Sequence, residues 1–397
     1  MGSRVLSIQS HVTYGYVGGK AAVFPLQCLG YDVDAVNTVD FSNHSGYGRF
    51  GGSRATAQDL ATIFDTMEAN GLFTQERIVT GYIPGAEALS VVSKLVKKMK
   101  LKNPDIIYLL DPVLGDSGKL YVAPDVIPIY RKLLPQATVI TPNWFEVETL
   151  TDIPLKDVPS LRRALKILHE EYHVPHVVMS SIPLHDFFRD ALPPHLIPSE
   201  QNSTITSSSY LLCISSTYSA CTANGSAVPN GINHTSDPSE VHAHVLPCIP
   251  GYFSGVGDLF SALVLAHFQP TLGSGHVSAF VQAGSSSVRS STDCTESSMH
   301  TPLSIAVSYA LSKTFEILKF THEQVLAQHP VSEDATDEER DRTDPERRVR
   351  RMRTRELRLI QGQHILRATP KLISNEHGGG DNVVQLCEMR PWNNFWR

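Results

Sequence analysis

Short apolar runs alternate with longer amphipathic stretches through the first half of the chain. The runs cover residues 5–8, 32–36, 78–81, 106–110, 138–140 and 177–179. Such runs suit buried parallel strands, and the stretches between them suit helices that cross from one strand to the next. The pattern therefore predicts an α/β fold with a mainly parallel central sheet flanked by helices.

The pattern changes in the second half. Residues 184–247 are dominated by polar residues and proline, apart from an apolar patch at 210–214 that predicts an antiparallel strand. We expect edge strands joined by long loops in this region. Helical periodicity returns at 259–268 and 305–318, and the Ser/Gly-rich piece at 273–301 predicts an insertion between two helices.

The C-terminal part gives weaker signals. Residues 333–358 alternate acidic and basic side chains, which indicates an exposed or partly disordered helical stretch. Periodicity stops after Pro370. We therefore expect one domain over residues 1–370, followed by a peripheral or disordered tail over residues 371–397.

Composition limits the partners. The 397 residues carry a formal net charge of -6, which supplies no overall attraction for nucleic acid or an anionic membrane. No uncharged apolar stretch approaches the roughly 18 residues that a spanning helix needs. The 6 cysteines are scattered without a CxxC pair, which favours a reducing compartment. We expect a cytoplasmic protein, with the nucleus as a second compartment left open, that binds neither nucleic acid nor membrane.

The segment Gly255-Val256-Gly257-Asp258 directly precedes an apolar helical pattern. Glycines let the backbone approach a ligand closely, and a helix start presents unpaired N–H groups to an anion. A carboxylate at Asp258 can accept the proton of an attacking hydroxyl while the N–H groups stabilise a phosphoryl group. Glycine and aspartate also cap helices for structural reasons, so this segment alone leaves both interpretations open.

Further polar clusters follow the earlier strands. Asp111 and Asp116 lie in one strand-end segment, and Asn143 and Glu146 lie in the next. Strand ends are where open α/β sheets bind ligands, and hard oxygen ligands of this kind suit Mg²⁺. The alternative is that Asp111 and Asn143 only cap helices or turns.

Eight segments of the chain follow a pattern that is specific when taken together. They are Ser7-Ile8-Gln9-Ser10-His11-Val12, Gly15-Tyr16-Val17-Gly18, Phe41-Ser42-Asn43-His44-Ser45-Gly46-Tyr47, Thr80-Gly81-Tyr82, Asp111-Pro112-Val113-Leu114-Gly115-Asp116, Thr141-Pro142-Asn143 with Glu146, Ser180-Ser181, and Gly255-Val256-Gly257-Asp258. In order and spacing they resemble the pyridoxal kinases of the ribokinase-like superfamily. The likeness covers residues 4–183 and 249–268, and it is patchy over 303–368.

The resemblance implies an ATP-dependent kinase that phosphorylates the 5′-hydroxymethyl group of pyridoxal, and of pyridoxine and pyridoxamine. It implies that Asp258 is the catalytic base and that Gly255 and Gly257 form the anion hole. The remaining implied roles fall into three sets: Ser10, Ser45 and Tyr82 contact the vitamer; Asn143, Ser180, Ser181, Tyr121, Val256 and Gly257 contact the nucleotide; Asp111, Asp116 and Glu146 surround Mg²⁺ and an activating K⁺. Tyr121 belongs to a flap over residues 116–121, and the family is typically a homodimer.

The chain departs from the family pattern in three places. Val256 stands where the family commonly has Thr, and the lost hydroxyl would cost roughly 1 to 3 kcal/mol at a charged oxygen, or about one to two decades of rate. Residues 184–209 and 273–301 exceed the usual length and leave the adenine contacts unassigned. The tail after residue 370 has no recognised counterpart.

These departures leave two alternatives to an active pyridoxal kinase. One is a catalytically weakened homologue that binds B6 vitamers. The other is a hydroxymethylpyrimidine-type kinase on the same scaffold. The retained Asp258, Asp116 and Glu146 argue against the first, and the clusters around Ser10 and Ser45 argue against the second.

Overall fold

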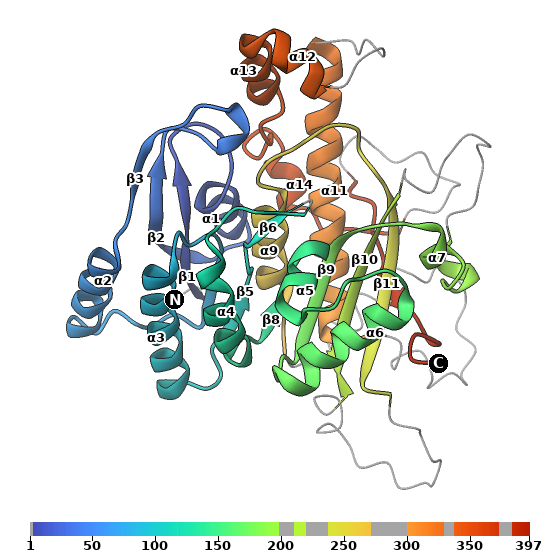
Figure 1. Ribbon diagram of the computed structural model, residues 1–397, viewed down its shortest axis with the longest axis horizontal. Helices are drawn as coiled ribbons and strands as arrows, with labels where there is room; N and C mark the ends of the chain where they lie inside the picture. The colour runs from blue at the N-terminus through green and yellow to red at the C-terminus, as the bar shows by residue number, and fades with distance from the viewer. Residues whose placement is uncertain are drawn as a thin grey trace, which may run out of the picture.

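The computed structural model describes residues 3–116, 118–197, 210–219, 237–270, 300–328, 337–372 and 383–397. Nearly all of the predicted insertion at 273–301 lies outside these residues, as does the part of the 184–209 insertion beyond residue 197. A 10-stranded sheet runs through the molecule in the order β12-β11-β10-β9-β8-β5-β4-β1-β2-β3 (Figure 1).

The parallel part of the sheet is built from the apolar runs. Its strands are β1 (Arg4–Val12), β2 (Asp32–Phe41), β4 (Arg77–Thr80), β5 (Ile107–Leu110), β8 (Val139–Ile140) and β9 (His176–Pro183). Every neighbouring pair among them is parallel. All residues of β4 and β5 are buried, as expected for a sheet covered on both faces. The predicted mainly parallel sheet is confirmed.

The two ends of the sheet are antiparallel. Beyond β9, strand β10 (Tyr210–Tyr218) pairs antiparallel with both β9 and β11 (Ser239–Pro247), and β12 (Arg390–Pro391) follows β11. At the other edge, β3 (Gly52–Arg54) pairs antiparallel with β2. The apolar patch at 210–214 thus forms the first half of an antiparallel strand, as predicted.

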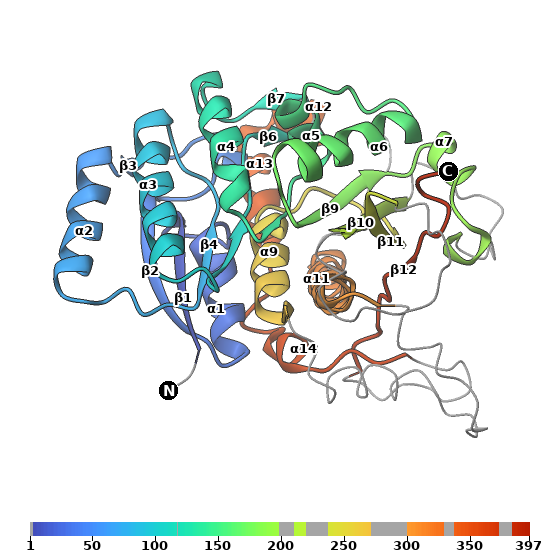
Figure 2. The ribbon, with the colours of Figure 1, turned by 90° about the horizontal axis from the view of Figure 1, so that it is seen from below.

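Helices cover both faces of the sheet (Figure 2). One layer contains α2 (Ala57–Ala69), α3 (Ala86–Lys102), α4 (Ile127–Leu133), α5 (Trp144–Thr151) and α6 (Val158–Lys166), and the other contains α1 (Gly19–Cys28), α9 (Val256–His267), α11 (Pro302–Gln328) and α14 (Gln363–Arg367). Because side chains alternate along a strand, Leu6 and Ile8 of β1 join the apolar cluster of the first layer while Val5 joins that of the second. The sheet therefore lies between two separate cores.

The polar segments follow the carboxyl ends of neighbouring parallel strands. Residues 81–82 follow β4, residues 111–116 follow β5, and residues 141–143 follow β8. Because these strands are adjacent and parallel in the sheet, their carboxyl ends meet at one edge. The sheet thereby gathers the candidate site residues from distant parts of the chain.

The C-terminal segment differs from the prediction. Residues 383–397 are not peripheral: Trp392 is 3% exposed and Phe395 is 1% exposed. Both side chains join the core under β11, and the main chain forms β12 on its edge. This packing could not be predicted from hydrophobic periodicity, because a segment docked along a sheet edge needs only a few apolar side chains and no regular period.

We expect Phe395→Ala to lower the free energy of unfolding by about 3–5 kcal/mol, the usual cost of emptying a buried phenylalanine site. Urea denaturation followed by tryptophan fluorescence measures the change. Val383→Ala is the control, because Val383 is 46% exposed and its loss should change stability by less than about 0.5 kcal/mol. A Phe395→Ala protein as stable as the parent would show that burial of this side chain does not stabilise the fold.

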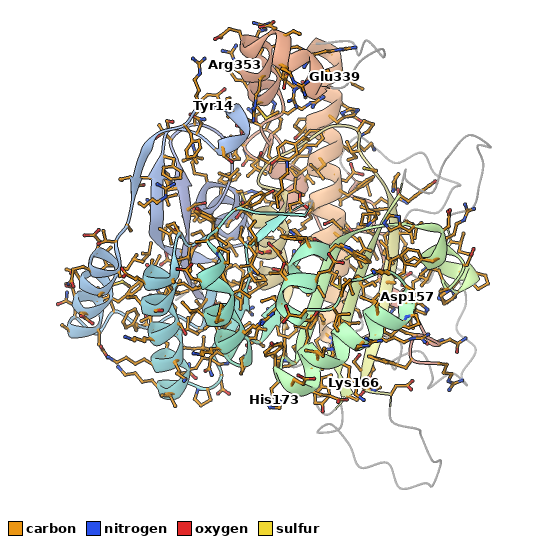
Figure 3. All side chains as sticks on the ribbon, viewed as in Figure 1. Tyr14, Asp157, Lys166, His173, Glu339 and Arg353 are labelled. Atoms are coloured by element: carbon orange, nitrogen blue, oxygen red, sulfur yellow. The ribbon has the colours of Figure 1, made fainter. Side chains whose placement is uncertain are left out.

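The charged stretch at 333–358 also packs more closely than predicted. Its described part forms α12 (Asp337–Thr343) and α13 (Pro345–Thr354), which Arg353 and Glu339 mark in Figure 3. Asp341 pairs with Arg347 and with Arg351, joining the two helices. Met352 is 4% exposed and Glu356 is 7% exposed. The stretch is therefore a helical pair with a buried side.

None of the helices in the described part of the chain has the length and apolar character that crossing a membrane requires.

Candidate active site

The start of α9 has the geometry of an anion site. Gly255 precedes the helix with a φ of 80°, in the left-handed region where glycine is favoured. A Cβ atom at Gly255 would lie 1.9 Å from the carbonyl oxygen of Tyr16, so the position has no room for a side chain. The first N–H groups of a helix have no partner within the helix, and they can therefore receive phosphate oxygens.

Asp258 lies in the first turn of α9, and its side chain is half-buried. The N–H of Gly18 donates a hydrogen bond to Asp258 Oδ2 over 2.8 Å. Burial raises the pKa of this carboxyl group, and the Gly18 hydrogen bond opposes part of that rise. A carboxylate whose pKa is raised toward neutrality is a better proton acceptor for an alcohol than an exposed one.

Glu146 and Asn143 are tied to the start of α5. Asn143 caps the helix, since its Oδ1 accepts from the N–H of Glu146 over 2.9 Å. Glu146 in turn accepts the N–H groups of Asn143 and Leu114, over 2.8 and 2.9 Å. The Asn143 side chain also donates to the carbonyl of Gly115 over 2.8 Å. Most of the hydrogen-bonding capacity of Asn143 is thus structural, which leaves one amide N–H for a ligand.

Asp111 follows β5 and is 6% exposed. Ser261 on α9 donates a hydrogen bond to Asp111 Oδ2 over 3.2 Å, and the Ser261 hydroxyl also lies 2.8 Å from Thr141 Oγ1. Burial raises the pKa of Asp111 well above its ordinary value, and repulsion from Glu146 and Asp258 adds to the rise. Asp111 therefore shares one negative region with these two carboxylates.

The electrostatics of this region fit a bound cation. Burial raises the pKa of Glu146 to about 8, although main-chain N–H groups lower it in part. Two buried carboxylates that repel each other are stabilised in the ionised form when a cation lies between them. Among the described residues, no group of three or more His, Cys, Asp or Glu side chains could hold a metal ion alone. Mg²⁺ usually takes only one or two protein carboxylates together with water and substrate phosphates, which fits Asp111 and Glu146.

All candidate site residues line one cavity of about 440 Å³. They are Ser10, Ser45, Tyr82, Asp111, Asp116, Tyr121, Asn143, Glu146, Ser180, Ser181, Gly255, Val256, Gly257 and Asp258. Asp116 and Tyr121 belong to a short hairpin of β6 (Gly115–Asp116) and β7 (Lys119–Leu120) and the residue after it, and Tyr121 is 55% exposed. This hairpin and Tyr121 include the segment 116–121 for which the family resemblance implies a flap.

Several lining residues were not singled out from the sequence. Leu211 and Leu246 come from β10 and β11, while Leu311, Phe315 and Leu318 come from α11. These apolar side chains give the cavity a wall suited to a flat ring, but in the sequence they are indistinguishable from core positions. His44 and Thr141 also line the cavity, and both stood inside recognised segments without an assigned role.

Together, the open α/β sheet, the helix start and the acidic cavity define a class of protein: a small-molecule kinase of the ribokinase-like type, in which a hydroxyl attacks a bound phosphoryl donor. Comparison with known proteins narrows this class. A family model for phosphomethylpyrimidine kinase matches residues 55–228.

A putative pyridoxal kinase of Schizosaccharomyces pombe is 34% identical over 327 residues, covering 82% of this chain and 87% of the relative. The human pyridoxal kinase is 37% identical over 268 residues, covering 66% of this chain and 76% of the relative. The solved pyridoxal kinase of Leishmania donovani, in complex with ADP and pyridoxamine, superposes with a TM-score of 0.66 at 27% identity, covering 98% of this chain and 99% of that one. The chain belongs to the pyridoxal kinase family.

Proposed function

We propose that this protein transfers the γ-phosphoryl group of ATP to the 5′-hydroxymethyl group of pyridoxal, and of pyridoxine and pyridoxamine. The observation that carries the proposal is the place of Asp258. Its carboxylate is held by Gly18 at the helix start beside Gly255 and Gly257. The same cavity contains Ser10, Ser45 and Tyr82, the residues assigned to the vitamer. The related Leishmania structures, which hold ADP with pyridoxamine or pyridoxine, support the same pair of ligands.

In the proposed reaction Asp258 accepts the proton of the hydroxymethyl group. Because Oδ2 already accepts the Gly18 N–H, we assign that proton to Oδ1. The vitamer oxygen forms its bond to the γ-phosphorus while the bond from that phosphorus to the bridging oxygen of ADP breaks. The N–H groups at Gly255, Val256 and Gly257 receive the negative oxygens of the phosphoryl group during the transfer.

The acidic residues are assigned to cations. Asp111, Asp116 and Glu146 would surround Mg²⁺ and an activating K⁺, with Asp111 and Glu146 as the buried pair suited to the divalent ion. A divalent cation in such a site neutralises the phosphate charge of the nucleotide. The raised pKa values of Asp111 and Glu146 support this assignment, because a cation offsets the burial of both groups.

The remaining assignments concern the nucleotide and the setting of the enzyme. Asn143, Ser180, Ser181, Tyr121 and Val256 would contact ATP, with Tyr121 on a hairpin that covers the reacting groups. The apolar wall from β10, β11 and α11 is the candidate surface for adenine. We further propose a cytoplasmic homodimer with a single catalytic domain over residues 1–370, extended by the packed C-terminal segment.

A comparison of acceptors tests the proposal. With Mg²⁺ and ATP present, ADP formation should show the highest kcat/KM with pyridoxal, pyridoxine or pyridoxamine, and a value at least about tenfold lower with hydroxymethylpyrimidine, which lacks part of the ring substitution. The phosphomethylpyrimidine kinase family model is the specific reason to include the last acceptor. A preference for hydroxymethylpyrimidine would make the protein a hydroxymethylpyrimidine-type kinase. Tight vitamer binding without any phosphorylated product would indicate a catalytically weakened homologue.

A further inference from the structure

Glu356 lies just after α13, far from the recognised segments in sequence but in contact with two of them. Its Oε1 accepts the hydroxyl of Tyr47 over 2.8 Å and lies 3.2 Å from His44 Nε2. Its Oε2 accepts the N–H of Tyr16 over 2.8 Å. One carboxylate therefore joins the turn after β1 to the loop after β2.

The charge of Glu356 is stabilised inside the protein. The side chain is 7% exposed, and burial alone raises the pKa of its carboxyl group. Hydrogen bonds from His44, the Tyr16 N–H and Tyr47 outweigh that effect, so the pKa lies below its ordinary value. Hydrogen bonds to an ionised group are stronger than those between neutral groups. Glu356 is thus a charged anchor rather than a surface residue of a charged helix.

One set of contacts connects Glu356 to Asp258, the proposed catalytic base. Glu356 holds the N–H of Tyr16, and two residues later the N–H of Gly18 donates to Asp258. The carbonyl oxygen of Tyr16 also packs against Gly255, where a Cβ atom would come within 1.9 Å. Displacement of this turn would therefore move the partners of both the base and the anion site.

A second set of contacts connects Glu356, through His44, to the part of the cavity assigned to the vitamer. The N–H of Gly46 donates to His44 Nδ1 over 3.1 Å, so this nitrogen is an acceptor and Nε2 carries the proton that faces Glu356. His44 thereby caps the short 3₁₀ helix η1 (Ser45–Tyr47), whose first residue lines the cavity. Ser254 Oγ lies 3.2 Å from the same Nδ1, which connects this second set of contacts to Gly255.

Glu356 and the preceding helix α13 pack tightly against the turn after β1 and the loop after β2. A Cβ atom at Gly15 would lie 2.4 Å from Glu356 Oε1, so only glycine leaves room for the carboxylate. Preceding residues of α13 pack on the same loop: Arg348 Nε donates to the carbonyl of Gly46 over 2.8 Å. Figure 3 shows Tyr14, in the turn after β1, and Arg353 of α13 at the same end of the molecule. The charged helical pair therefore forms part of the support of the site.

We propose that Glu356 is a positioning residue of the acceptor site, which acts through His44, Tyr47 and the Tyr16 N–H to fix Ser45 and the turn that holds Asp258. His44 and Ser45 line the cavity, whereas Glu356 stands behind that wall and does not touch the substrate. The identity of the acceptor, pyridoxal, rests on the proposed function.

Glu356→Gln tests the proposal, because glutamine keeps the shape but replaces one acceptor oxygen by an NH₂ group that faces donors. We expect the Kd for pyridoxal, measured by equilibrium dialysis without ATP, to rise about 10- to 100-fold, the reach of a buried charged hydrogen bond. The Kd for ATP should rise by less than about threefold, because Glu356 reaches the anion site only through the main chain of Tyr16, while the apolar wall proposed for adenine comes from β10, β11 and α11. Tyr47→Phe, which removes a single hydroxyl, should weaken pyridoxal binding in the same direction by about 3- to 10-fold.

Glu346→Gln is the matched control, since Glu346 lies on α13 but pairs with Arg49 at an exposed position, 67% accessible. It should bind pyridoxal like the parent. Equal pyridoxal binding by Glu356→Gln and the parent overturns the inference, and so does an equal loss of pyridoxal and ATP affinity. Failure of the proposed function is recognised separately: the parent would form no ADP with pyridoxal, while the binding comparison would still decide the role of Glu356.

Discussion

Asp258→Asn is expected to lower kcat for pyridoxal phosphorylation by about two to four decades, the usual contribution of a positioned general base. Asparagine can still accept the hydrogen bond from Gly18 through its carbonyl oxygen, so the helix start should keep its structure. It cannot accept the hydroxyl proton at neutral pH. The Kd for pyridoxal should stay within a few-fold of the parent, because the base acts in the transition state and not in the bound ground state.

Single-turnover kinetics, with the enzyme in excess over pyridoxal and MgATP added to start the reaction, measure this loss directly. Asp105→Asn serves as the control, since Asp105 is exposed and does not line the cavity. An Asp258→Asn variant that turned over like the parent would mean that another group takes the proton. A variant that lost stability in parallel would instead assign Asp258 a capping role, the alternative that the sequence left open.

Gly255→Ala and Gly257→Ala form a pair with opposite expected effects on stability. Gly255 has a φ of 80°, and a Cβ atom there would lie 1.9 Å from the carbonyl oxygen of Tyr16. The backbone strain costs about 1–3 kcal/mol, and the Tyr16 carbonyl must also move. Because the same turn carries the Gly18 N–H that holds Asp258, kcat/KM should fall by at least about a hundredfold together with the melting temperature.

Gly257 lies inside α9 with ordinary helical geometry, and a Cβ atom there would meet nothing within 4 Å. Alanine is favoured over glycine in a helix by up to about 1 kcal/mol, so Gly257→Ala should melt at or above the parent temperature. Differential scanning calorimetry of both variants decides the matter. Equal melting temperatures for Gly255→Ala and the parent would contradict the close contact between the helix start and the turn after β1.

The sequence predicted most of the framework and the polar part of the site because both follow from local rules. Buried parallel strands appear as apolar runs, and the polar residues after β4, β5 and β8 meet because neighbouring parallel strands share an edge. The segment around Asp258 became a candidate anion site for the same reason, since glycines before an apolar helix favour anion binding, whereas the role of Asp258 as the base comes from the family resemblance and stays a prediction.

The remaining features could not be predicted from the pattern of neighbouring residues. Phe395 is buried through docking onto a sheet edge, a contact without a periodic signal. Glu356 lies in a run of charged residues, where one buried carboxylate looks like its exposed neighbours. Phe315 lines the cavity from α11, but in sequence it resembles any core position of a helix. Each of these residues owes its role to a partner far away in the chain.

In the proposed reaction, one cavity brings together a hydroxyl of a B6 vitamer, the carboxylate of Asp258 and the γ-phosphoryl group of ATP. The most direct measurement follows ATP labelled in its γ-phosphoryl group, incubated with the protein, Mg²⁺ and pyridoxal, by separation of the products. We expect the label in pyridoxal 5′-phosphate, with one molecule of ADP for each phosphorylated vitamer. Label found only in inorganic phosphate, or ADP formed at the same rate without pyridoxal, would contradict it.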